Sequence, residues 1–158
     1  MTKDEVTPLQ PRKFFSGVWH GEGELIPSPL IAWLMPKEKV HLQSRAVWLT
    51  DTIWKVEESF EFSSGRVIQR KMFAEMVAPD RLHVTADDMP LGADIILHER
   101  GFRFTPYYIL GKYGGRRWQL RCEDDNRLDE SGIIHDRIEM FFFGVRVAEI
   151  RLMVRVER

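Results

Sequence analysis

The stretch Trp54-Lys55-Val56-Glu57-Glu58-Ser59-Phe60-Glu61-Phe62 decides the fold class. Its even positions are apolar except Glu58, and its odd positions are polar throughout. This period of two is typical of a β-strand with one buried face. The turn residues Ser63-Ser64-Gly65 follow, and a second alternating stretch runs over 67–76. Together the two stretches predict a β-hairpin.

The same alternation recurs along the rest of the chain, with Gly, Pro, Asn and Asp between the stretches. Further strands are predicted over 18–25, 40–49, 81–87, 93–99, 102–108, 117–123, 134–143 and 145–156. The only helical segment predicted is a short one, Pro29–Met35. Short antiparallel strands that each have one apolar face must close into a barrel or stack as a sandwich. We therefore predict an all-β fold: a single antiparallel up-and-down β-barrel of about 8–10 strands over 14–158. A flexible N-terminal arm is expected over 1–13.

Composition restricts the classes of function. The 158 residues carry 23 basic and 24 acidic side chains, a formal charge of -1, which argues against a nucleic-acid binder. Cys122 is the only cysteine, so no intramolecular disulfide forms, and a cytoplasmic location is expected. We expect Cys122 itself to be a small core residue. The longest uncharged stretch, 25–36, contains three prolines and is too short to span a membrane.

Glu58 and Arg70 each interrupt an otherwise apolar strand face. Pairing around the Ser63-Ser64-Gly65 turn places the two side chains opposite each other. A buried charge needs a partner, so the pair has two interpretations. In the first, Arg70 binds the carboxylate of a fatty-acid-like ligand, and Glu58 is its partner when no ligand is bound. In the second, the two residues form an interior salt bridge that fixes the register of the hairpin.

Large apolar and sulfur-containing side chains supply the rest of a predicted ligand-binding wall. Its members are Trp54, Phe60, Met72, Phe104 and Met140. Aromatic and methionine side chains make an adaptable surface for an apolar guest, but the same residues also suit plain core packing. Both interpretations stay open from the sequence.

Catalytic and metal-binding patterns are absent from the sequence. No two of the five histidines have metal-ligand spacing, and no serine lies in a Gly-x-Ser-x-Gly elbow. The acid pairs Asp87-Asp88 and Asp124-Asp125 lie beside turn-forming residues, so they are predicted to be solvated turn acids. We predict no metal, no cofactor and no enzymatic activity.

A family resemblance is carried by the run Gly17-Val18-Trp19-His20-Gly21-Glu22-Gly23, which is similar to the opening of the calycins, the lipocalins and fatty-acid-binding proteins among them. A broader series resembles an uncharacterised bacterial lipocalin-like family of unknown function. That series comprises Trp54, Glu57 or Glu58, Phe60, Phe62, Gly65, Arg70, Ala86-Asp87-Asp88, Asp136-Arg137-Ile138-Glu139-Met140 and Phe143-Gly144-Val145. The resemblance implies the barrel and a largely buried Trp19 at its floor, and it implies no established activity.

Three functions follow as hypotheses. The first is a non-enzymatic barrel that binds a small hydrophobic or amphipathic ligand in its interior. The second is a structural or interaction module whose barrel is filled by its own side chains and which forms a homodimer. The third follows from a resemblance of the opening run to haem-binding barrels of the nitrobindin type, with His98 or His135 as a lone haem ligand facing the cavity.

Overall fold

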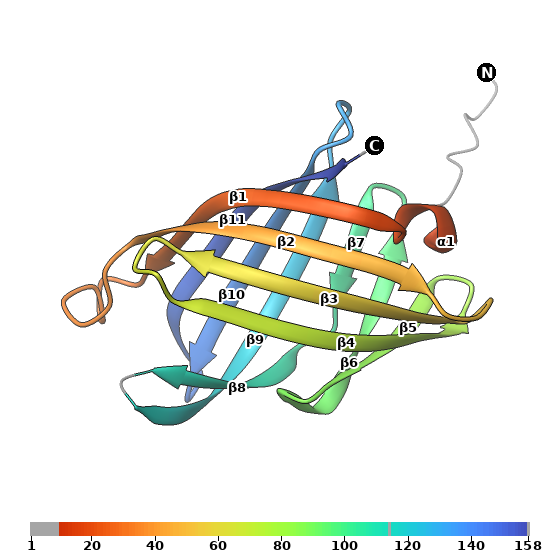
Figure 1. Ribbon diagram of the computed structural model, residues 1–158. Coiled ribbons are helices and arrows are strands. Elements are labelled where there is room, and N and C mark those ends of the chain that lie inside the picture. Colours follow the sequence, from red (N-terminus) through yellow and green to blue (C-terminus); the bar gives the residue numbers. More distant parts are fainter. Residues whose placement is uncertain (1–9, 114, 158) are drawn as a thin grey trace, which may run out of the picture.

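Eleven strands form one sheet in the computed structural model, which describes residues 10–113 and 115–157 (Figure 1). The strands are β1 Gly17–Pro27, β2 Glu38–Trp48, β3 Ile53–Phe62, β4 Val67–Ala78, β5 Arg81–Ala86, β6 Met89–His98, β7 Gly101–Phe104, β8 Tyr107–Tyr113, β9 Arg116–Leu128, β10 Ile134–Phe142 and β11 Val145–Glu157. Their inward side chains alternate with outward ones, as β2 shows most regularly. The predicted all-β fold is confirmed.

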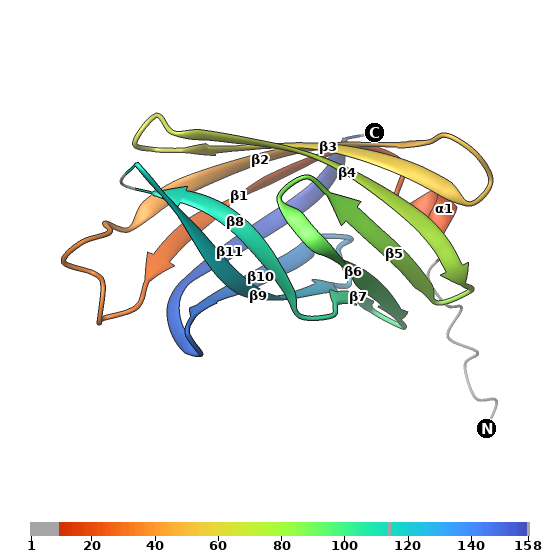
Figure 2. The same ribbon diagram turned by 90° about the horizontal axis from the view of Figure 1, so that it is seen from below.

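The sheet closes on itself as an antiparallel barrel. The strands β1 to β7 are neighbours in chain order, β9 follows β7, and β9 also pairs with β10. The last strand, β11, pairs with β1 from Ala148↔Pro27 to Glu157↔Val18. Ten strands thus complete the ring, and the views in Figures 1 and 2 show how β9, β10 and β11 cross behind β1 to β4. The predicted up-and-down barrel is confirmed.

The closing seam between β1 and β11 depends on a glycine. A Cβ atom added to Gly23 would lie only 1.7 Å from the backbone oxygen of Arg151. No side chain fits at that distance, so the two strands approach closely only because this position lacks one. The glycine-rich opening run therefore has a direct structural role in closing the barrel.

The predicted strand over 102–108 is wrong, because the chain breaks it at Thr105 and Pro106. The two pieces, β7 and β8, both pair with β9, at 125–127 and 116–122 respectively. Proline has no backbone N–H to donate to a neighbouring strand, so the ladder is interrupted there. The short strand β8 extends beyond the ring along one end of β9.

The helical segment predicted over Pro29–Met35 is also wrong. It forms hydrogen-bonded turns, with Ile31 N donating to Ser28 O at 3.0 Å and Leu34 N donating to Ile31 O at 2.9 Å. Prolines at both ends leave too few residues to nucleate a helix. The four-residue helix is instead α1, Pro11–Phe14, inside the predicted arm, while residues 1–9 of that arm lie outside the described residues.

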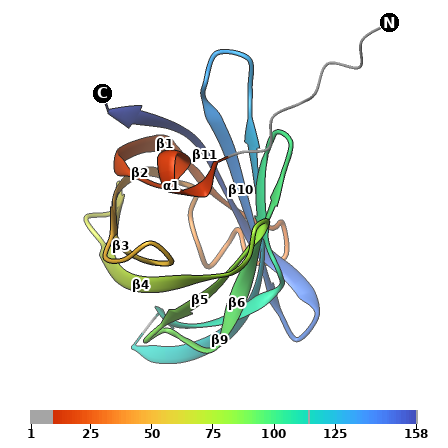
Figure 3. The same ribbon diagram turned by 90° about the vertical axis from the view of Figure 1, so that its right-hand side faces the viewer.

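Two clusters of buried apolar side chains fill the barrel. The first contains Phe15 and Trp54 together with residues of β4 to β9, and the second contains Leu25, Leu42 and Phe60 together with residues of β10 and β11. The helix α1 lies beside the ends of β1 and β2 at one opening of the barrel, as Figure 3 shows from that side. Phe14, Trp19, Phe102 and Met140 contact one or both clusters while remaining partly exposed.

Candidate functional site

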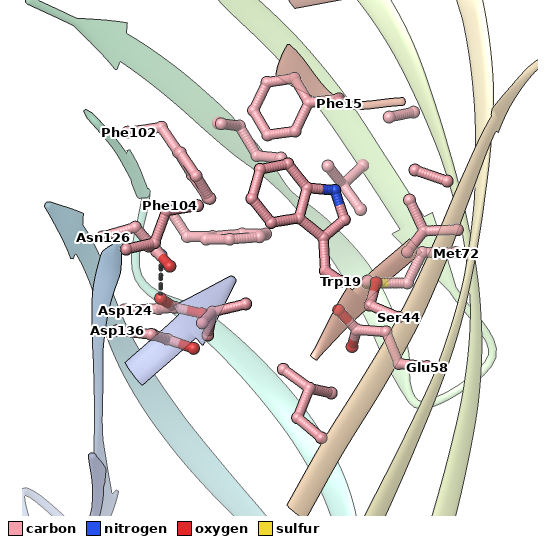
Figure 4. A pocket seen from close by; sticks show the side chains of 18 of the residues that line it. Phe15, Trp19, Ser44, Glu58, Met72, Phe102, Phe104, Asp124, Asn126 and Asp136 are labelled. Carbon is pink, nitrogen blue, oxygen red and sulfur yellow. Dashed lines mark hydrogen bonds between the residues drawn. The ribbon is translucent and has the colours of Figure 1, made fainter. Parts of the chain in front are cut away.

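An internal cavity of about 110 Å³ lies between the two clusters. About 10–15 Å³ holds one water molecule, so this space has room for a small organic molecule or for several waters. Residues of β1 to β4 form one wall, and residues of β5 to β10 form the other. Figure 4 shows Glu58, Ser44 and Met72 on the first wall and Asp124, Asn126 and Asp136 on the second.

Aromatic side chains surround the cavity near α1. The Phe15 ring stacks on Trp54 at a centroid distance of 4.5 Å and meets the Phe102 ring edge-on at 5.0 Å. Phe14 contacts Trp19 at 5.5 Å. Trp19 is partly buried: it packs against the second apolar cluster, and its ring also lines the cavity (Figure 4). This end of the site is therefore an aromatic enclosure.

Arg70 is the basic group of the cavity wall, and two carboxylates hold it. It lies opposite Glu58 in the β3–β4 register, as predicted, with 3.8 Å between Arg70 Nη1 and Glu58 Oε2. The closer partner is Asp88, whose Oδ2 lies 2.8 Å from Arg70 Nε and whose Oδ1 accepts a hydrogen bond from Nη2 at 3.3 Å. Asp88 is thus an ion-pair partner rather than a solvated turn acid, whereas Asp87 is exposed as predicted.

The opposite wall carries a second group of acids on β9 and β10. Asp124 accepts hydrogen bonds from Asn126 Nδ2 at 2.7 Å and from the Tyr107 hydroxyl at 3.3 Å. It also forms a hydrogen bond with the carboxyl group of Asp136. Asp124 is only 9% exposed, so its prediction as a solvated turn acid is wrong: β9 continues through this position and directs the side chain inward.

Burial controls the protonation of these acids. Desolvation raises the pKa of Asp124 to about 7, although hydrogen bonds from Asp136 and Asn126 act to lower it. Desolvation and the charge of Asp124 raise the pKa of Asp136 well above its ordinary value. Desolvation also raises the pKa of Glu58, although Arg70 opposes it. Two adjacent carboxyl groups in such a place share a proton, and here Asp136 holds it.

Three buried polar atoms on the cavity walls have no hydrogen-bond partner in the described part of the chain, and one of them, Arg70 Nε, is held by the ion pair with Asp88. The other two are the indole Nε1 of Trp54, a residue only 4% exposed, and Oδ1 of Asp136. A buried polar group without a partner is costly, and native proteins contain few of them. Both residues line the cavity, so both bear on what the cavity holds.

Six of the seven predicted ligand-binding residues line the cavity: Trp54, Glu58, Phe60, Arg70, Met72 and Phe104. Met140 does not line it and packs against both apolar clusters instead. Sequence reasoning missed the acid wall of Tyr107, Asp124, Asn126 and Asp136. No local pattern marks this wall, because Asp124 and Asn126 alternate with charged residues along β9 and both faces of the strand are polar.

The haem hypothesis fails on the positions of its histidines. His98 is exposed, and His135 is exposed with its Nε2 2.8 Å from Asp129 Oδ2, so neither faces the cavity. Among the described residues, no group of three or more His, Cys, Asp or Glu side chains is placed to hold a metal ion. Cys122 is a small buried core residue, as predicted, and desolvation raises the pKa of its thiol to about 12.

The fold and the cavity define the class: a lipocalin-like antiparallel β-barrel with an internal cavity. Within that class, the chain belongs to the family described as protein of unknown function (DUF3833), whose model matches residues 2–156. No curated protein matches the chain.

Two solved structures have similar folds. An S-type phycobiliprotein lyase from Guillardia theta is 11% identical, with a TM-score of 0.64 over 100% of this chain and 98% of its own. A protein of unknown function from the DUF3598 family of Nostoc punctiforme PCC 73102 is 18% identical, with a TM-score of 0.62 over 96% of this chain and 51% of its own. At these identities the similarity establishes the shared fold.

No helix within the described residues is long and apolar enough to cross a membrane. The cytoplasmic location stays a prediction.

Proposed function

We propose that this protein is a calycin-like binding protein that holds a small amphipathic molecule inside its barrel. One observation carries the proposal: an internal cavity has aromatic walls at one end and buried polar groups, two of them with an unpartnered atom, along its sides. Cavities of this composition are the usual sites for small ligands. The apolar walls would receive the body of the ligand, and the polar residues would fix its orientation.

The chain offers no good thiol nucleophile, which favours a binding role over covalent catalysis. The only thiol, Cys122, lies in the barrel wall with a raised pKa, so it is a poor nucleophile at neutral pH. One observation favours an acid–base enzyme as the second candidate, namely the Asp124–Asp136 pair with its raised pKa values in a cavity. The bound molecule would then be recovered chemically altered.

Native mass spectrometry of freshly purified protein tests the proposal. We expect a bound small organic species, of a size that the cavity of about 110 Å³ admits, that is released intact on denaturation. The variant Ala46→Phe, which fills the cavity from β2, should lose this species. The control Val47→Phe, at the exposed neighbouring position, should keep it.

Other outcomes would contradict the proposal. A clean mass without adduct in every preparation, together with a stable dimer, would favour the interaction module. A bound species that wild type converts to a product, and that the Asp124→Asn variant leaves unchanged, would favour the enzyme.

A further inference from the structure

The charges that line the cavity are unbalanced. Within the described residues the wall contains one basic side chain, Arg70, and three acidic ones, Glu58, Asp124 and Asp136. Arg70 is already held by Glu58 and by Asp88, which lies just outside the cavity wall. Asp124 and Asp136 form no ion pair in the part of the chain that the structure describes. The acid wall therefore has no cation of its own.

A buried carboxylate is stable only when it is paired or protonated. The Asp124–Asp136 pair satisfies this condition by sharing a proton, and the hydrogen bonds from Tyr107 and Asn126 orient it. The unpartnered Oδ1 of Asp136 shows that this arrangement leaves one oxygen without a donor. A ligand with a charged N–H donor would supply both the missing charge and the missing hydrogen bond.

The space next to the acid wall suits the rest of such a ligand. The stacked rings of Phe15 and Trp54 and the edge-on Phe102 form an aromatic enclosure at the α1 end of the cavity. Aromatic faces attract cations, most strongly where water is excluded. The unpartnered Trp54 Nε1 lies in this same enclosure, so both ends of the cavity have a polar atom that the protein does not satisfy.

An anionic ligand meets the opposite situation. A carboxylate placed at Arg70 would compete with Asp88 at 2.8 Å and would lie in a cavity with three acidic side chains. Like charges in a low-dielectric site repel strongly. The geometry of the acids therefore argues against the fatty-acid-like ligand that the sequence suggested.

We infer that the ligand is an organic cation, a protonated amine with an apolar or aromatic body, whose ammonium group lies against Asp124 and Asp136. The inference rests on the proposed function and specifies the chemical class of its ligand. Binding would displace the proton that the pair shares, so affinity for the amine would rise with pH.

The pH dependence belongs to a set of groups rather than to one carboxyl. Asp124 is faced by Asp136 on β10, Tyr107 on β8, Glu58 on β3 and Arg70 on β4, and its own strand contributes Cys122 and Asn126. The charge of Asp125, also on β9, acts on Asp136 as the weakest of the causes that raise its pKa. Asp88 acts on the same set through Arg70. Of these groups, the Asp124–Asp136 pair is the one for which a ligand cation replaces a proton directly.

Three matched probes test the inference: 3-phenylpropylamine, 3-phenylpropan-1-ol and 3-phenylpropanoate, which differ in the charge of the polar end. Calorimetric titration of wild type should show the amine binding at least about tenfold more tightly than the alcohol, and the carboxylate more weakly than the alcohol. The amine affinity should rise between pH 5.5 and pH 8.5, and the alcohol affinity should stay constant.

The double variant Asp124→Asn/Asp136→Asn should lose the preference for the amine and the pH dependence while still binding the alcohol, which shows that its cavity is intact. The control Asp125→Asn changes the neighbouring residue, whose side chain pairs with exposed Arg127 instead, and should keep the preference.

The failures of the two claims are distinguishable. Equal or better binding of the alcohol or the carboxylate would overturn the cation inference and leave the proposed binding function standing. Binding of none of the three probes, together with a clean native mass, would overturn both.

Discussion

Two of the places where this barrel buries carboxyl groups differ in how many cations pair with them. Glu149 on β11 is fully buried, yet it faces outward, where Arg137 donates to it at 3.1 Å and Arg146 and Arg151 also pair with it. On the inside, Asp124 and Asp136 are adjacent acids with no ion pair among the described residues. The same chemical group is therefore buried with three ion-pair partners in one place and with none among the described residues in the other.

The two places respond to burial in opposite directions. At Glu149, desolvation raises the pKa, but hydrogen bonds from Arg151 and Arg137 outweigh it and the pKa is lowered. At Asp124 and Asp136, desolvation prevails and the pKa values rise. Burial alone thus does not decide whether a carboxyl is charged, because the number of cations within reach does. The outer network joins β10 to β11, whereas the inner pair is left for a ligand to neutralise.

The largest expected effect comes from removing Arg70, the one basic side chain on the cavity wall among the described residues. Arg70→Met leaves Glu58 and Asp88 without their partner, so it should destabilise the protein by about 3–5 kcal/mol at pH 8 in urea melts. The loss should shrink toward pH 5, because Glu58 has a raised pKa and takes up a proton. Adding Asp88→Asn to Arg70→Met should restore much of the loss. Strictly additive losses in the double variant would mean that the two side chains do not interact.

The inner pair should make the protein less stable as the pH rises. Its folded-state pKa values lie above the ordinary value of 3.8, so the folded protein binds more protons and loses stability between about pH 4 and pH 7 or beyond. Between pH 4 and pH 8, the free energy of unfolding of wild type should therefore fall by about 2–4 kcal/mol more than that of the double variant Asp124→Asn/Asp136→Asn. Urea melts across this range measure the difference. Parallel pH profiles would show that the pair is not perturbed.

The outer network should have the opposite pH dependence. Because the pKa of Glu149 is lowered, its stabilisation is present above its ordinary value of 4.5 and is lost as the pH falls through the lowered pKa. Glu149→Gln should therefore cost about 2 kcal/mol at pH 7 and much less at acidic pH. The measurement is again the free energy of unfolding. A cost that stays constant down to pH 3 would contradict an electrostatic origin.

The smallest effect is expected next to the inner pair. Asp125 follows Asp124 in β9 but pairs with exposed Arg127 at 3.1 Å, and exposed ion pairs contribute little. Asp125→Asn should change the stability by less than about 0.5 kcal/mol at every pH. A change in the pH dependence of stability as large as that of the Asp124→Asn/Asp136→Asn variant would mean that the position in the chain, rather than burial, controls the effect.

The sequence predicted one wall of this site and missed the other for a physical reason. Glu58 and Arg70 each interrupt an apolar face across a short turn, so hairpin geometry alone placed them together. The inward face of β9 instead reads Cys122, Asp124, Asn126, and polar side chains on both faces leave no hydrophobic period to detect. Asp136 and Asp124 meet only through the β9–β10 register, which no local pattern encodes.

The fold itself was more predictable because it depends on repeated local patterns. Alternation located the strands of the hairpins, such as β3 with β4. It failed where a single residue overrides the pattern, as Pro106 does between β7 and β8.

The inner carboxyl pair holds a proton because it has no ion-pair partner among the described residues, whereas the outer carboxylate is charged. Carbon-13 NMR titration of the side-chain carboxyl groups in the unliganded protein tests it most directly. The account predicts that Asp124 titrates near 7, that Asp136 titrates well above 3.8, and that Glu149 titrates below 4.5. Ordinary pKa values for Asp124 and Asp136 would contradict it, and so would a raised value for Glu149.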